Sequence, residues 1–253
     1  MKTTVLAILA LTLFGSAVGQ AAPPSSPAEL DRAATRILES SERLATAINF
    51  AFDHLATFIA LSGAPDQVIH QELKDTTARL NGVRSILVVA KDGSIQWDTI
   101  SFPPPTLNLS SRNYIRNAFS STHLVFDEVA VGKTSGFPFV PVAAYKPAIG
   151  AVITGVLDPR ELQRPMEWCP ESCGGALLTR EGRIIVISPV ETRLSFDLID
   201  EIRVAHAAGA EEGILFESRE NFNLRLAWIA SGDFPIYAVA FSYTAISPTS
   251  SLN

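Results

Sequence analysis

The same order of β-prone and helical segments occurs twice along this chain of 253 residues. This repeat limits the possible folds more than any other feature of the sequence. Each copy begins with two strand-like runs joined by a glycine-containing turn, continues through one helical stretch and ends with three further strand-like runs. The segments are 85–90, 94–100, 112–120, 125–131, 137–146 and 148–157 in the first copy, and 175–179, 183–188, 192–207, 213–218, 223–231 and 236–243 in the second. Asp92-Gly93, in the first turn, is a strong hairpin signal. We therefore predict an α+β fold with two similar modules, each a five-stranded antiparallel sheet with crossing helices.

A long helical segment precedes the first module. Apolar residues between Glu29 and Leu61 recur mostly at three- and four-residue steps, which is typical of an amphipathic helix. Pro27 stands near its start and Gly63 near its end, as expected of helix boundaries. A second helical stretch covers about 65–80. The long helix could also pair with a second copy to form a homodimer, or dock on a partner.

The N-terminus has the pattern of a secretory signal peptide. Lys2 is followed by the apolar run 5–14 and then by the small-residue stretch 15–22. The apolar run is too short for a membrane-spanning helix, which needs about 20 residues. Cleavage after Gly19 or Ala21 fits best, and an uncleaved anchor is the alternative.

Nothing after residue 14 is expected to form a second membrane span, so we expect a periplasmic or secreted protein. The predicted organisation is a signal peptide (1–22), an N-terminal helical segment (27–80), a first module (81–162), a second module (163–245) and a tail (246–253).

The composition excludes some functional classes. Hydrophobic residues make up 47% of the chain and charged residues 18%, which is typical of an ordered globular protein and not of a disordered one. The 20 basic residues against 26 acidic ones give a net charge of −6, and no block of basic residues occurs. Because a nucleic-acid backbone requires clustered Lys and Arg, we expect no nucleic-acid partner.

Cys169 and Cys173 are the two cysteines of the chain. In an exported protein such a pair is expected to form a disulfide, and two free thiols or half of a zinc site are the alternatives. The four histidines are scattered without ligand spacing, so we expect no metal.

The sequence contains no complete motif of known catalytic chemistry. Gly132-Lys133-Thr134 is similar to the end of a phosphate-binding loop, but the first glycine that such a loop needs is replaced by Asp127. No Gly-x-Ser-x-Gly or His-Glu-x-x-His motif occurs. We expect neither an enzyme nor a cofactor.

Three stretches carry a resemblance to a known family. They are 108–119, with its Arg-x-aromatic start of a helix, 129–141, with Gly132 and Ser135-Gly136, and 155–162, with Asp158-Pro159. Together with the long first helix, they resemble the double Cache domain (dCache or PDC-type), a PAS-like extracytoplasmic sensor of chemoreceptors, histidine kinases and diguanylate cyclases. The resemblance covers about residues 28–243.

The resemblance implies a function and a site. Such domains bind amino acids, amines or carboxylates between the sheet and the helix of the membrane-distal module. Arg112 matches the pocket arginine, Tyr114 the first aromatic residue, and Asp158 lies near the acidic residue that receives a ligand amine. An arginine can hold a carboxylate with two charge-assisted hydrogen bonds.

Each of these residues also has a structural interpretation. Arg112 could pair with Asp127 or Glu128, Tyr114 could be a core residue, and Asp158 could be a helix cap. Trp97, Tyr145 and Lys133 are further ligand candidates, whose facing depends on strand register.

The sequence thus predicts an exported sensor that binds a small carboxylate or amino acid and signals to a membrane partner. The alternative is a secreted interaction or scaffold protein that uses the same fold without a ligand pocket.

Overall fold

The computed structural model describes residues 26–133, 135–168, 172–219 and 221–246. The predicted signal peptide, residues 1–22, lies outside the described residues, as does most of the predicted tail.

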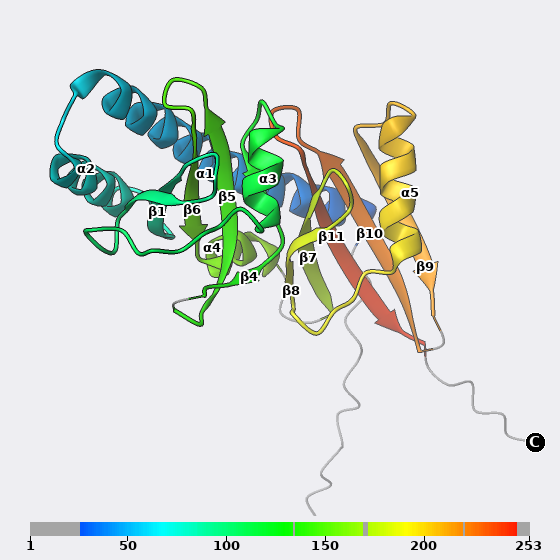
Figure 1. Ribbon diagram of the computed structural model, residues 1–253. Coiled ribbons are helices and arrows are strands. Elements are labelled where there is room, and N and C mark those ends of the chain that lie inside the picture. Colours follow the sequence, from blue (N-terminus) through cyan, green and yellow to red (C-terminus); the bar gives the residue numbers. More distant parts are fainter. Residues whose placement is uncertain (1–25, 134, 169–171, 220, 247–253) are drawn as a thin grey trace, which may run out of the picture.

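Two antiparallel sheets form the fold (Figure 1). The first contains six strands: β1 (Val83–Val89), β2 (Ile95–Asp98), β3 (Val125–Phe126), β4 (Ala130–Val131), β5 (Pro138–Lys146) and β6 (Ala151–Leu157). The second contains five strands: β7 (Cys173–Thr179), β8 (Ile184–Ser188), β9 (Glu212–Ser218), β10 (Phe222–Ala230) and β11 (Ile236–Ala245). Their orders, β2-β1-β6-β5-β3 and β8-β7-β11-β10-β9, correspond strand by strand. The predicted α+β fold with two similar modules is confirmed.

Helices cover both faces of each sheet. They are α1 (Pro27–Ser62), α2 (Asp66–Ala78), α3 (Asn113–Phe119), α4 (Pro159–Gln163) and α5 (Phe196–Ala207), with one 3₁₀ turn at Arg164–Met166. Helix α1 runs behind both sheets, whereas α3 lies in front of the first sheet and α5 in front of the second (Figure 1). Each module is therefore a sheet between a shared rear helix and its own front helix.

Local sequence signals fix both ends of α1. Ser26 and Glu29 form a reciprocal capping box, in which the Glu29 side chain accepts a hydrogen bond from the Ser26 backbone at 2.7 Å. Pro27 occupies the first turn, where its missing N–H costs nothing. Gly63 ends the helix at φ 57°, a left-handed conformation that glycine adopts without strain.

The strands distribute their side chains by simple alternation. In β11, Ile236, Ala238 and Ala240 face the cluster that contains α1. The intervening residues of the strand, among them Tyr237 and Phe241, face the cluster that contains α5. Both faces of this strand are buried, which explains its nearly continuous apolar sequence.

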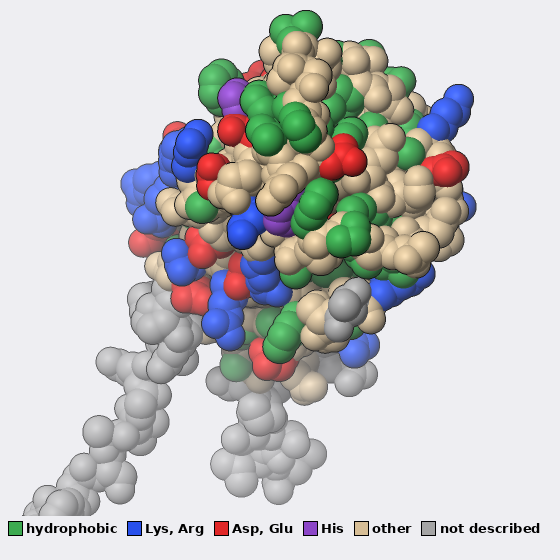
Figure 2. Space-filling view, turned by 60° about the vertical axis from the view of Figure 1, so that its left-hand side comes forward, with side chains coloured by type: hydrophobic (Ala, Val, Ile, Leu, Met, Phe, Trp, Pro, Cys, Tyr) green, Lys and Arg blue, Asp and Glu red, His purple; other side chains and the backbone are tan. Residues whose placement is uncertain are grey.

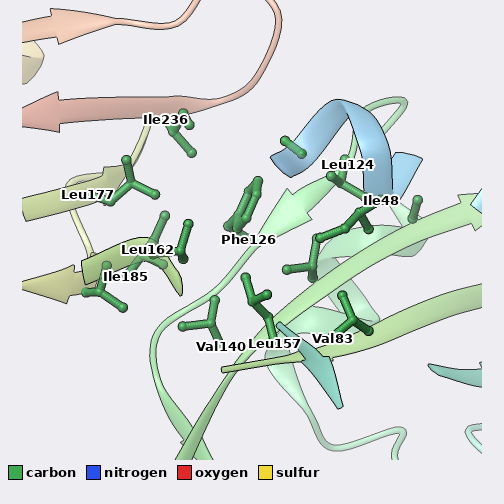
Figure 3. Close-up of a cluster of buried hydrophobic side chains, with 14 of the residues drawn as sticks. Ile48, Val83, Leu124, Phe126, Val140, Leu157, Leu162, Leu177, Ile185 and Ile236 are labelled. Carbon is green, nitrogen blue, oxygen red and sulfur yellow. The ribbon is translucent and has the colours of Figure 1, made fainter. Parts of the chain in front are cut away.

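One hydrophobic core joins the two modules. The cluster that packs against α1 includes buried residues of both sheets and of α4. Figure 3 shows Phe126 of the first module between Leu177 and Ile236 on one side and Ile48 and Leu157 on the other. The modules therefore share buried apolar surface and do not merely touch.

Helix α1 has the length and composition of a membrane-spanning helix. Over an 18-residue window it is apolar enough, and as a whole long enough, to cross a membrane, although no span was expected after residue 14. Its apolar residues have another role in the structure, because Leu30, Ile37, Ile48 and Phe52 are fully buried against the two sheets.

Two predicted segments differ from the structure. The run 125–131 forms two short strands, β3 and β4, because the Asp127 side chain accepts a hydrogen bond from the Glu128 N–H at 2.9 Å and the chain turns out of the ladder there. The first sheet therefore has six strands and not five. Helix α5 begins at Phe196 and not at 192, since Ser195 caps it by accepting a hydrogen bond from Leu198 N at 3.2 Å.

Charged side chains do not separate by sign on the face shown in Figure 2. Lys and Arg lie among Asp and Glu on that face, and hydrophobic side chains gather over its upper part.

Candidate functional site

Arg112 stands at the start of α3 in the first module, where its backbone occupies the N-cap position. One terminal nitrogen, Nη2, donates a long hydrogen bond of 3.4 Å to the carbonyl of Val131 on β4. The Nε–H of the same guanidinium is buried and has no hydrogen-bond partner. Because buried donors are nearly always paired, this group is suited to an acceptor supplied from outside the chain.

Tyr114 follows on the inner face of α3. Its side chain is only 5% exposed and packs edge-to-face on Phe139, with ring centroids 6.4 Å apart. Burial raises the pKa of the Tyr114 hydroxyl, the charge of Arg112 opposes that rise and the charge of Asp127 adds to it. The phenol is therefore neutral at physiological pH and lies within the fields of both charged groups.

Asp127 links this region to the second module. Its side chain is 6% exposed and forms an ion pair with Arg183, which precedes β8. Arg183 also lies 3.7 Å from Glu128 and 3.6 Å from Glu181. Among the described residues, Asp127 and Glu128 thus form their ion pairs with Arg183 of the second module and not with Arg112.

A hollow of about 530 Å³ lies between the modules at this point. On one side it is lined by Asn113 and Asn117 of α3 and by Ser120, which caps the end of that helix. On the other side it is lined by Thr179, Glu181 and Arg183 of the second module. Its volume falls within the range of about 300–1,000 Å³ that small-molecule sites occupy.

The structure brings two more candidates near α3. Tyr145 on β5 packs against Phe119 of α3, with centroids 5.3 Å apart. Lys133 is exposed on the turn between β4 and β5, two residues beyond the Val131 carbonyl that Arg112 contacts. Arg112, Tyr114 and Tyr145 therefore lie on the same side of the first sheet, and Lys133 is exposed on the turn that follows β4.

Trp97 lies on the opposite side of that sheet. The register shifts between Val88 and Val89 of β1: Val88 pairs with Trp97, whereas Val89 pairs with Ile95. One extra residue of β2 therefore lies between Ile95 and Trp97 as a bulge. Ile95 consequently faces the α3 side, whereas Trp97 packs toward the α1 side and donates its indole N–H to Asp66 at 3.1 Å. The bulge is the physical reason why Trp97 does not join Arg112.

The partners of Asp158 belong to α4 and β1. It is the N-cap of α4, where it accepts a hydrogen bond from Arg160 N at 3.0 Å, and it forms a 3.0 Å ion pair with Arg84. The capping role that its Asp-Pro-Arg-Glu sequence indicates is therefore present.

Comparison with known proteins identifies the architecture. The sequence matches no family model and no curated protein. In structure, it is similar to the extracellular domain of a protein designated histidine kinase rpHK1S-Z16, with a TM-score of 0.72 and 15% identity over 86% of this chain and 94% of that one. The chain has the double Cache fold.

Ligand-bound chemoreceptor domains have the same Cache architecture. The sensory domain of Campylobacter jejuni Tlp3 with isoleucine bound matches at a TM-score of 0.59 and 12% identity, over 85% of this chain and 91% of that one. The ligand-binding domain of Pseudomonas fluorescens CtaA in complex with L-alanine matches at 0.58 and 13%, over 86% and 95%.

The sequence does not indicate the contact between Asp127 and Arg183, which lies beside this candidate site. In the sequence pattern, Asp127 is a possible partner for Arg112 and the residue at the first glycine position of the phosphate-loop pattern, and nothing marks Arg183. Their separation of 56 residues leaves no local signal, because the pair forms only when the β7–β8 hairpin packs against the first module.

The predicted disulfide remains a prediction, since Cys169 lies outside the described residues. Within the described part of the chain, no group of three or more His, Cys, Asp or Glu side chains could hold a metal ion.

The Asp158 cap gives a pH-dependent prediction. Burial pushes the pKa of Asp158 up, but the hydrogen bond from Arg160 N and the charge of Arg84 outweigh it and leave the pKa below its ordinary value. A lowered folded-state pKa stabilises the protein above the unfolded pKa of about 3.9, and this stability is lost as the pH falls through the folded value.

We expect Asp158→Ala to cost about 1 kcal/mol in urea unfolding at pH 7, and progressively less as the pH falls below about 4. Asp158→Asn, which keeps the cap and removes the charge, should retain most of the stability at pH 7 and lose the pH dependence. A cost of Asp158→Ala that grows toward low pH would contradict this assignment.

Proposed function

We propose that this protein is an exported sensor that binds a small carboxylate or amino acid in its first Cache module and signals to a membrane partner. One observation carries the proposal: the Arg112 Nε–H is buried without a partner beside the buried Tyr114. A ligand carboxylate would supply the acceptor, and the guanidinium would hold it by charge-assisted hydrogen bonds.

The surroundings of Arg112 suit a ligand with an apolar part. Three residues of the β4–β5 region are hydrophobic and exposed, Val129 at 44%, Val131 at 59% and Phe137 at 65%. Exposed hydrophobic side chains grouped beside a charged anchor are typical of binding surfaces. Isoleucine bound to Tlp3 and alanine bound to CtaA are ligands of this class in proteins of the same fold.

Contacts between the modules offer a route for the signal. Asp127 acts on the Tyr114 hydroxyl by its charge and forms an ion pair with Arg183 of the second module. A ligand anion at Arg112 would change the field at Asp127 and bias this pair. The binding event would thereby reach the second module and helix α1 behind it.

The test is a thermal-shift screen of amino acids and small carboxylates on the protein without residues 1–22. We expect at least one hit, and we expect Arg112→Ala to weaken its affinity by about tenfold or more, because a charge-assisted bond to a carboxylate is lost. Arg116→Ala is the matched control: it removes an exposed arginine of the same helix, whose partner is Asn113, and should leave the affinity unchanged.

A second candidate, a scaffold protein without a ligand pocket, is favoured by the packing of α3. Tyr114, Ile115 and Ala118 are all buried directly against the sheet. On α1, Phe50 is 76% exposed and could contact a second copy. A screen without hits, together with a dimeric mass in light scattering, would favour this function over sensing.

A further inference from the structure

We propose that a second hollow, on the second module, binds a small organic monocarboxylate independently of the Arg112 site. This hollow, of about 490 Å³, lies beside α5 and the loop between β10 and β11. Its polar lining consists of Arg180, Arg203, His206, Asp233 and, from the first module, His123. We call it the Arg180 hollow.

The charge of the Arg180 hollow is opposite in sign to that of the protein. Two arginines and two histidines line it against one carboxylate, that of Asp233, while the whole chain carries a net charge of −6. With both histidines neutral, the lining carries a charge of +1, the sum of two arginines and one aspartate. A concave basic site on an acidic protein concentrates small anions, and a single positive charge matches a single carboxylate.

Arg180 is held in place on three sides. Its Nη2 donates a hydrogen bond to the Ser231 carbonyl, and its guanidinium lies over the Tyr237 ring at 5.1 Å from the centroid. Its Nη1 contacts Nε2 of His206. Its Nε–H is buried and has no hydrogen-bond partner. Each terminal nitrogen also carries a second N–H, so Arg180 is a fixed cation with donors left for a carboxylate.

His206 explains how this arginine is positioned. Its Nδ1 lies 3.0 Å from the carbonyl of Ala210, which can only accept a hydrogen bond, so Nδ1 carries the proton. In the neutral ring, Nε2 is then an acceptor and takes the hydrogen bond from Arg180. The ring also packs edge-to-face on Tyr237, with centroids 5.3 Å apart. His206 and Tyr237 therefore pack on each other and together hold the guanidinium of Arg180 in place.

The other walls of the hollow define the class of ligand. Phe234, Pro235, Tyr237 and Ala207 supply apolar surface next to the guanidinium of Arg180. A bare inorganic anion would leave this surface unused, whereas a short aliphatic carboxylate covers it and places its oxygens at the arginine. Arg203 is exposed on α5 and forms a 2.8 Å surface pair with Asp200, which it can exchange for a ligand at low cost.

Calorimetric titration with butyrate tests the proposal, with butyramide as the uncharged analogue and inorganic phosphate as the second anion. The protein is the chain without residues 1–22 carrying Arg112→Gln, so that binding at the first module does not contribute. We expect saturable binding of butyrate, and much weaker binding of butyramide and phosphate.

In that background, Arg203→Gln should weaken butyrate binding by about fivefold, and Arg180→Lys by about tenfold or more, since each removes a charge-assisted or bidentate contact. Arg203 is exposed, so its variant tests the site even where Arg180→Lys fails to fold. Arg193→Gln, an exposed arginine of the same module outside the lining, is the matched control and should leave the affinity unchanged.

Three results would overturn the proposal. The first is the absence of saturable butyrate binding up to about 10 mM, a concentration that corresponds to a binding free energy near 3 kcal/mol. The second is an affinity for butyrate that Arg203→Gln leaves unchanged. The third is binding of butyramide as strong as that of butyrate.

Discussion

Phe126→Ala is expected to lower the free energy of unfolding by about 3–5 kcal/mol, the cost typical of removing a buried phenylalanine. Phe126 is 2% exposed and belongs to the cluster that includes α1 and both sheets (Figure 3). Its removal leaves a cavity between the modules, where rigid strands on both sides limit collapse. Since most domains have only about 5–15 kcal/mol of stability, this is a large fraction of the total.

Urea unfolding followed by circular dichroism and tryptophan fluorescence measures this effect. Because the core is continuous, both probes should report a single transition in the unsubstituted protein. Phe216→Ala, on the exposed face of β9 at 58% exposure, is the control and should change the stability by less than about 0.5 kcal/mol. Two separate transitions, or a cost for Phe126→Ala below about 1 kcal/mol, would show that the modules are energetically independent.

Much of this fold could be predicted because its signals are local. The Asp-Gly turn, the alternating runs and the periodicity of 29–61 each depend on neighbouring residues, and each gave the correct type of element. The break between β3 and β4 could not be predicted in this way. Val125 to Val131 is rich in β-formers, and it is the buried side chain of Asp127, held by Arg183, that turns the chain there.

The candidate site could be predicted only in part, for a similar reason. Arg112, Tyr114 and Tyr145 lie on one side of the first sheet, as a ligand site would require. Trp97 was a candidate whose facing depended on register, and a one-residue bulge turns it to the opposite side. Arg183 and the Arg180 hollow depend on how the second module packs on the first, a long-range property without a sequence pattern.

The ion pair between Asp127 and Arg183 is the contact between the modules that the proposed signalling route uses. Asp127 is nearly buried at 6% side-chain exposure, while Arg183 is 29% exposed and also faces Glu128 and Glu181. Removing Arg183 would leave the Asp127 carboxylate buried without its cation. A buried charge that loses its partner costs far more than an exposed one, because its desolvation is no longer offset.

Arg183→Ala is therefore expected to reduce the free energy of unfolding by about 3 kcal/mol, near the lower end of the range for breaking a buried pair, since the arginine is partly solvated. Asp127→Asn should cost less, and the double variant should be more stable than the sum of the two single costs predicts. We expect a coupling energy of about 1.5–3 kcal/mol in the double-mutant cycle measured by urea unfolding at pH 7.

The matched control is Arg43→Ala, which removes an exposed arginine 3.7 Å from Glu39 on the outer face of α1 and should cost less than about 0.5 kcal/mol.

The same variants test whether the ion pair between Asp127 and Arg183 takes part in sensing. Arg183→Ala should change the affinity of any ligand that depends on Arg112, since Asp127 acts on the neighbouring Tyr114. Additive single costs, together with an unchanged ligand affinity, would show that the ion pair neither stabilises the interface between the modules nor transmits a signal across it.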